Sequence, residues 1–140
     1  MPDVYQKTQS WIKKDEALKL IPYVDTTGNL TVGWGRNLRN GIRIDEAELM
    51  FQNDLKQTVE ELEKQTWYID QPHNVQNALI NMNFNLGITK LLEFKDMITA
   101  LEHKNYRAAA QAALNSLWAK QVGPIRSQDM AKRLKTGSYA

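Results

Sequence analysis

The chain has 140 residues, of which 42% are hydrophobic and 24% charged, so it is long enough for one globular domain with a sizeable core. It has no cysteine, which excludes a disulfide scaffold, and its two histidines, His73 and His103, lack the spacing of a metal site. There is neither an apolar run long enough to span a membrane nor a basic-then-apolar signal sequence. We expect one domain, made in the cytoplasm without a signal peptide, that needs no metal or cofactor.

The net charge is only +2, but it is unevenly distributed. Residues 45–63 hold seven acids and one lysine, a charge of −6, whereas residues 120–135 hold five bases and one aspartate, a charge of +4. A basic C-terminal face could steer the protein toward an anionic polymer such as a cell wall, or it could be an ordinary solvated helix face. No basic-aromatic motif supports a nucleic-acid partner.

The first third of the chain predicts a helix followed by a β-hairpin. The helix is predicted by positions that recur at helical spacing, namely Val4, Lys7-Thr8, Trp11-Ile12 and Asp15. Residues 20–24 and 30–34 are short and rich in β-branched or aromatic side chains, and the Asp-Thr-Thr-Gly-Asn segment between them is typical of a turn. Residues 36–43 are predicted to form a loop.

The rest of the chain is predicted to be helical. Asp45 with Glu48 has the spacing of a capping box, and a long helix follows it with an apolar stripe. After a break at residues 67–72, helices are expected at about 74–86, 91–102, 106–119 and 125–135. The fold class is therefore α+β and mostly helical, with a small hairpin lobe at about 18–43 and a helical lobe at 44–140. The N-terminal helix is expected to belong to the helical lobe, with a cleft between the two lobes.

The pattern that indicates chemistry is the series Glu16, Asp25 and Thr31, followed at once by Gly33-Trp34-Gly35. The glutamate closes a helix, the aspartate opens a turn, and the threonine lies on the following strand. Two carboxylates and a hydroxyl on adjoining elements suit hydrolysis of a glycosidic bond, in which one carboxylic acid protonates the leaving oxygen and a carboxylate positions water.

Each of the three residues has an ordinary structural explanation. Glu16 could be a solvent-facing charge, Asp25 only a turn former, and Thr31 a common strand residue. Their order and the two glycines that follow favour the catalytic interpretation.

This series resembles the bacteriophage lysozyme (endolysin muramidase) family, typified by the T-even phage lysozyme. The family pattern is Asp-Glu-Gly, then Tyr-x-Asp-Thr-x-Gly, then Thr-(Ile/Val)-Gly-x-Gly. The similarity continues through the Asn-Met-Asn-Phe-Asn-Leu-Gly of residues 81–87 and the Trp-Ala-Lys-Gln-Val-Gly of residues 118–123. It therefore covers nearly the whole chain.

The resemblance implies a lysozyme-like fold and a peptidoglycan hydrolase that cuts the β-1,4 bond between N-acetylmuramic acid and N-acetylglucosamine. Glu16 is then expected to be the general acid, while Asp25 and Thr31 orient the attacking water. The resemblance also implies inversion, which requires the two carboxyl groups to lie about 6.5–9.5 Å apart.

Further residues are assigned by the resemblance. Arg126 would pair with Glu16 or be a surface cation, and Arg36, where the family usually has histidine, is expected to form an ion pair with Asp54. Asn37, Phe84 and Asn85 are expected on the cleft wall, although Phe84 could instead be core. Trp34 could stack on a sugar or cover the hairpin.

Two other functions compete with the muramidase. A lytic transglycosylase works with a glutamate alone and releases an anhydro-sugar. A non-catalytic wall-binding or phage-structural module does not need the series Glu16, Asp25 and Thr31. The favoured partner is bacterial peptidoglycan, reached in the periplasm after release from the host cytoplasm. We expect a monomer with no stable membrane insertion.

Overall fold

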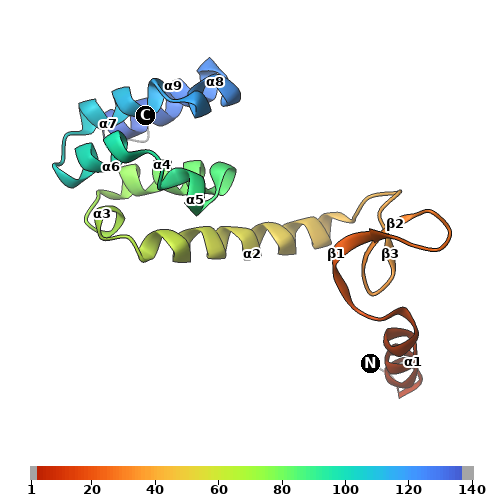
Figure 1. Ribbon diagram of the computed structural model, residues 1–140. Helices are drawn as coiled ribbons and strands as arrows, with labels where there is room; N and C mark the ends of the chain where they lie inside the picture. Colours follow the sequence, from red (N-terminus) through yellow and green to blue (C-terminus); the bar gives the residue numbers. More distant parts are fainter. Residues whose placement is uncertain (1–2, 137–140) are drawn as a thin grey trace. The chain divides into compact units, whose positions relative to one another are not determined.

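The computed structural model describes residues 3–136, and these fall into two compact units that divide between Leu49 and Met50. The first unit contains a helix and a small sheet, and the second is entirely helical (Figure 1). This is the predicted α+β, mostly helical class. The assignment of the N-terminal helix to the helical lobe, and the cleft between lobes, stay predictions.

The first unit is built around a three-stranded antiparallel sheet of order β1-β2-β3. It comprises α1 (Asp3–Glu16), β1 (Lys19–Val24), β2 (Leu30–Gly33), β3 (Arg36–Asn37) and the start of α2 (Ile44–Glu63). The register places Thr31 opposite Tyr23 on one side and opposite Asn37 on the other. Thr31 thus lies on the central strand, next to the turn that follows β1.

Two sequence predictions for this unit need correction. The predicted loop at 36–43 begins with a third strand, because β2 turns back at Trp34-Gly35 and pairs Val32 with Arg36. Helix α2 begins at Ile44, so Asp45 lies inside its first turn instead of before it. The carboxylate that accepts from the backbone N–H of Arg43 at this end is that of Glu46, at 2.8 Å.

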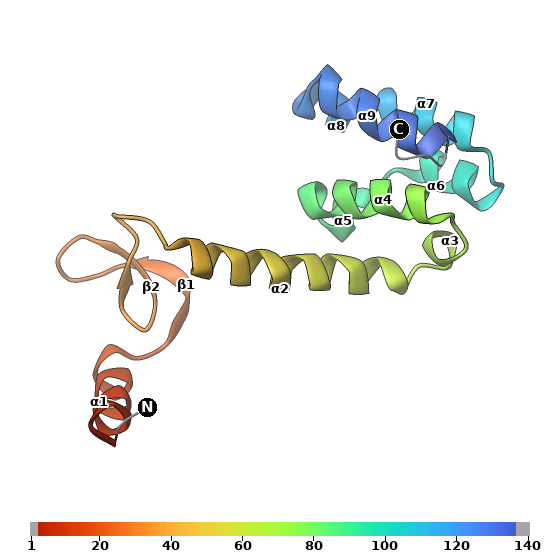
Figure 2. The same ribbon diagram turned by 180° about the vertical axis from the view of Figure 1, so that it is seen from behind.

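The second unit packs its helices around α4 (His73–Leu86), whose inner face buries Val75, Ala78, Leu79 and Met82. Besides the rest of α2, this unit contains α3 (Thr66–Ile69), α5 (Ile88–Leu91), α6 (Lys95–Glu102), α7 (Tyr106–Leu114), α8 (Leu117–Val122) and α9 (Pro124–Thr136). Helices α7 and α9 lie side by side in both ribbon views (Figures 1 and 2). The buried alanines of α7 have small side chains, which allow this close approach.

Three helix boundaries differ from the sequence prediction. The supposed break at 67–72 overlaps the short helix α3, and the supposed helix at 91–102 begins only at Lys95, after α5 has ended. The supposed helix at 106–119 is divided in two. Ser116 causes that division, because its hydroxyl accepts from the N–H of Ala119 at 3.3 Å and so caps α8. No helix among residues 3–136 is long and apolar enough to cross a bilayer.

Candidate active site

Asp25 follows β1 directly and organises the turn between β1 and β2. Its Oδ1 accepts three hydrogen bonds, from the N–H of Asn29 at 2.8 Å, from the N–H of Thr27 at 2.9 Å and from the Thr27 hydroxyl at 2.8 Å. Hydrogen bonds to the charged form stabilise it, so the Asn29 N–H and the Thr27 hydroxyl lower the pKa of Asp25 below its usual value. This carboxyl group is ionised over the physiological pH range.

The second oxygen of Asp25 faces Thr31. The Thr31 side chain is buried, with 3% of the residue exposed. Its hydroxyl lies 2.9 Å from the carbonyl oxygen of Asn29 and 3.5 Å from Oδ2 of Asp25. Because a hydroxyl has one proton, it donates to the nearer carbonyl, and its lone pairs remain to accept. Oδ1 is therefore committed to the turn, whereas Oδ2 and the Thr31 hydroxyl form a polar pair that can hold a donor such as water.

Glu16 is the last residue of α1, and the chain reverses immediately after it. Ala17 has a φ of +56°, a left-handed conformation, and its N–H donates to the carbonyl of Lys13 at 3.0 Å. The carboxyl group of Glu16 reaches the turn between β2 and β3. A Cβ built on Gly35 would lie 2.5 Å from Oε2 and 2.9 Å from Cδ of Glu16. The absence of a side chain at Gly35 is what gives the Glu16 carboxyl room to lie there.

The Gly-x-Gly motif thus has a definite structural role. Gly33 and Gly35 have φ values of +70° and +81°, which residues other than glycine adopt only at a cost in free energy. Trp34 stands between them, 43% exposed, with the ammonium of Lys13 5.1 Å from its ring centroid. The three predicted catalytic residues and this motif all lie in the first unit.

Arg36 has a partner that sequence reasoning missed. Its guanidinium donates two hydrogen bonds to the Glu46 carboxylate, at 2.8 and 2.5 Å. This fork, the Arg43 N–H and the nearby charge of Arg43 lower the pKa of Glu46 to about 2. Glu46 directly follows Asp45, the residue predicted to cap α2. Its position next to that predicted cap is the signal by which the sequence could have indicated its role. Asp54 belongs to the second unit, and the Arg36–Asp54 ion pair stays a prediction.

The predicted substrate-binding residues are divided between the units. In the first unit, Asn37 lies on β3, where its Oδ1 accepts from the N–H of Arg39 at 2.8 Å. In the second, Phe84 and Asn85 lie near the end of α4. Phe84 is 41% exposed, so it is not the core residue that its helix position allowed. Its ring is tilted against that of Phe51, with centroids 5.6 Å apart.

Asn85 is tied to the helical core, because its Oδ1 accepts from Nε1 of Trp118 at 2.9 Å. Arg126, near the start of α9, donates to Oδ1 of Asn81 on α4 at 2.8 Å. Arg126 therefore has a structural partner within its own unit. Its pairing with Glu16, which belongs to the first unit, stays a prediction.

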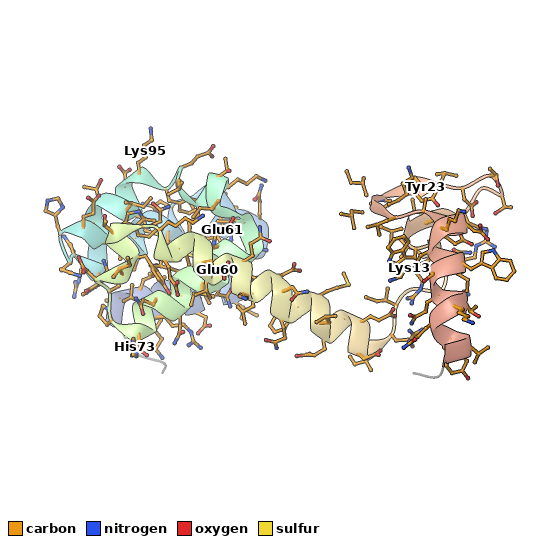
Figure 3. All side chains as sticks on the ribbon, turned by 90° about the horizontal axis from the view of Figure 1, so that it is seen from below. Lys13, Tyr23, Glu60, Glu61, His73 and Lys95 are labelled. Atoms are coloured by element: carbon orange, nitrogen blue, oxygen red, sulfur yellow. The ribbon has the colours of Figure 1, made fainter. Side chains whose placement is uncertain are left out.

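A polar residue that sequence reasoning passed over joins α2 to α4. Asn83 is 1% exposed, and its Nδ2 donates to the carbonyl of Thr58 at 3.0 Å and to Glu61 at 3.4 Å. Figure 3 labels Glu61 and its neighbour Glu60 on this part of α2. Asn83 and Thr58 are 25 residues apart in sequence, so no local pattern indicates their contact.

Comparison with known proteins identifies the family. Residues 13–136 match the family model described as Phage lysozyme. Two proteins of Dictyostelium discoideum, named Probable T4-type lysozyme 1 and 2, are each 28% identical over 158 aligned positions, covering 91% of this chain and 92% of theirs. The Pre-baseplate central spike protein Gp5 of Enterobacteria phage T4 is 25% identical over 142 positions, covering 79% of this chain and 24% of that protein. The chain therefore belongs to the phage lysozyme family, whose members are lysozyme-type glycosidases of peptidoglycan.

Proposed function

We propose that this protein is a muramidase that hydrolyses the β-1,4 bond between N-acetylmuramic acid and N-acetylglucosamine in peptidoglycan, in the manner of a phage endolysin. The observation that carries the proposal is the unequal use of the two oxygens of Asp25. Three donors hold Oδ1 in the turn, and Oδ2 faces the Thr31 hydroxyl. A carboxylate needed only for the turn would not require a buried hydroxyl beside its second oxygen.

In the proposed mechanism Glu16 donates its proton to the glycosidic oxygen as the bond breaks. The ionised Asp25 stabilises the positive charge that develops on the sugar ring, because its lowered pKa keeps it negative. Oδ2 of Asp25 and the hydroxyl of Thr31 hold a water that attacks the anomeric carbon from the opposite face, and Oδ2 takes the proton that this water loses. This displacement inverts the configuration and gives the α-anomer.

Asn37, Phe84 and Asn85 are proposed to contact the glycan, and Arg126, Arg36 and Asp54 to support the site. Phe84 offers an exposed ring face for an apolar sugar face, since 41% of it is accessible. The amide of Asn85 has donors suited to the carbonyl of an N-acetyl group, and its Oδ1 is already fixed by Trp118.

A second candidate function follows from the similarity to a baseplate spike protein. In this alternative the chain acts as a wall-binding or structural module of a phage particle and does not depend on catalysis. A lytic transglycosylase remains the enzyme alternative. The polar pair of Asp25 and Thr31 favours hydrolysis, because the transglycosylase reaction needs no positioned water.

The proposal is tested with purified protein on outer-membrane-permeabilised cells and on isolated peptidoglycan. We expect turbidity to fall, and mass analysis to show products with a free reducing end. Anhydro-sugar products, which are lighter by one water, would identify a transglycosylase, and binding without product would identify a structural module. Glu16→Gln should lower the rate by ~10²–10⁴-fold, the usual contribution of a general acid. Asp15→Asn, which removes the neighbouring carboxylate, is the matched control and should keep the parent rate.

The stereochemistry is tested by NMR of the new reducing end before mutarotation. An α-anomer supports a water held by Asp25 and Thr31. A β-anomer would mean a retaining route, with carboxyl groups only about 5–5.5 Å apart, and would contradict the role given to Thr31. Thr31→Glu places a carboxylate where the water is proposed to lie, and it should shift the outcome toward the β-anomer.

A further inference from the structure

The last turn of α1 contacts the turn between β2 and β3 through two side chains. The ammonium of Lys13 lies over the indole of Trp34, 5.1 Å from the ring centroid. The carboxyl of Glu16 lies against the backbone of Gly35, the residue after Trp34. Figure 3 labels Lys13 on α1 and Tyr23 on the adjoining sheet, within the same unit. One turn of helix thus rests on one turn of the sheet at two adjacent points.

Lys13 and Glu16 are coupled through the helix itself. Residues three apart lie on the same side of a helix, and the hydrogen bond from the N–H of Ala17 to the carbonyl of Lys13 closes the turn that contains both. Holding the head of Lys13 on the indole therefore restricts the rotation of this turn. Because Glu16 is the last helical residue, its direction depends on that rotation.

The side chains of α1 are exposed along residues 4–16. The chain reverses at Ala17 in a left-handed conformation. A glutamate has three side-chain torsions, so a carboxyl group on such a helix end is poorly oriented unless something restrains it. A general acid must stay within hydrogen-bond reach of its proton acceptor, and small displacements lower the rate strongly.

We propose that Lys13 and Trp34 form a clamp that orients the Glu16 carboxyl over Gly35, and that both are positioning residues for the general acid. The inference rests on the proposed function, because it assigns Glu16 that role. It also assigns Trp34 a specific task, which is to hold Lys13 and not to stack on a sugar. A cation over an indole face is attracted by the ring quadrupole, and arginine can replace lysine there.

The test measures kcat and KM on soluble peptidoglycan fragments. Lys13→Met should lower kcat about two- to five-fold, the size expected from losing one exposed cation–π contact, and leave KM unchanged. Lys13→Arg should restore kcat. Lys14→Met removes the same charge from the adjacent position and should keep the parent kcat. Trp34→Leu should lower kcat as much as Lys13→Met does. The double variant should be no slower than either single variant, because each substitution removes the same cation–π contact.

A readout independent of activity is the proton shift of the Lys13 side-chain methylenes, which the indole ring current moves upfield. Trp34→Leu should abolish that displacement, whereas Trp11→Leu should leave it. Parent kcat in Lys13→Met, a raised KM in Trp34→Leu, or additive losses in the double variant would overturn the clamp. Glu16→Gln in the same assay separates the two hypotheses. If it is inactive while Lys13→Met is normal, only the clamp fails, and if it retains the parent rate, the proposed function fails.

Discussion

The Glu16 carboxyl lies beside Gly35 in the space that a β-carbon would fill, with Oε2 2.5 Å from the position of such an atom. Contact at that distance forces the carboxyl to move. A methyl group at position 35 therefore acts on the proposed general acid without changing any titratable group.

We predict that Gly35→Ala lowers kcat by about 100-fold, the scale expected from moving a catalytic group by about 1 Å. Gly41→Ala is the matched control, because Gly41 has a similar φ of +77° and no atom within 4 Å of the added methyl. Both variants should lose roughly 1–2 kcal/mol of unfolding free energy from left-handed strain. Denaturant melts measure the loss of stability, and kcat measures the effect of displacing the Glu16 carboxyl. Equal activity in both variants would show that Glu16 does not depend on Gly35.

The second prediction concerns Ala17, which stands where the family pattern has glycine. Its φ of +56° is unfavourable for a side chain with a β-carbon. Ala17→Gly should raise the unfolding free energy by about 0.5–1 kcal/mol, since the relief of strain exceeds the added chain entropy. Ala47→Gly, inside α2, should lower it by about 0.5–1 kcal/mol. Urea melts in which the unfolding free energy changes in opposite directions would confirm the left-handed conformation of Ala17. A lower unfolding free energy in both variants would contradict it.

The turn of Asp25 could be predicted from the sequence because its partners lie within four residues. The Asp-Thr-Thr-Gly-Asn segment specifies a turn, and an aspartate side chain folds back on its own backbone in such segments. Local chemistry of this kind also located β1, β2 and α4. It could not find β3, because two residues have no periodicity of their own and pair only after the preceding turn has formed.

The partner of Arg36 shows the opposite case. It depends on the path of residues 37–43, which brings Arg36 to Glu46 ten positions along the chain. Asn83 and Thr58, 25 positions apart, meet only after α2 and α4 have packed. Such contacts are set by tertiary packing, and sequence spacing contains no information on them. The pairs Arg36–Asp54 and Glu16–Arg126 join residues of different units and stay predictions.

The third prediction is a pH dependence of stability from Glu46, whose pKa is lowered to about 2 from an ordinary value of 4.5. A carboxyl group with a lower pKa in the folded state stabilises the fold above its unfolded pKa. That contribution should be lost as the pH falls from about 4.5 to about 2. Asp25, whose pKa is also lowered, acts in the same direction.

Glu46→Gln should therefore flatten the decline of stability in this acid range, measured as urea midpoints at a series of pH values. Arg36→Gln should flatten the decline only in part, because the N–H and the charge of Arg43 still lower the pKa of Glu46, and the double variant should resemble Glu46→Gln. Arg36→Lys keeps the charge but loses the fork, so it should restore only part of the slope. An unchanged slope in Glu46→Gln would show that another carboxyl group dominates acid unfolding.

The last prediction separates the structural and chemical roles of the Thr31 hydroxyl. Thr31→Ala removes a buried hydroxyl that contacts the Asn29 carbonyl and Oδ2 of Asp25, and Thr58→Ala removes a buried hydroxyl that donates to the Asp54 carbonyl at 2.8 Å. Each loss should lower the unfolding free energy by about 1 kcal/mol. Only Thr31→Ala should lower kcat, by about 10- to 100-fold, because the proposed water loses one of its two contacts. Thr31→Ser keeps the hydroxyl and should recover most of the rate. If Thr31→Ala and Thr58→Ala lose the same stability and both keep the parent kcat, the hydroxyl supports only the turn, and Asp25 alone must orient the water.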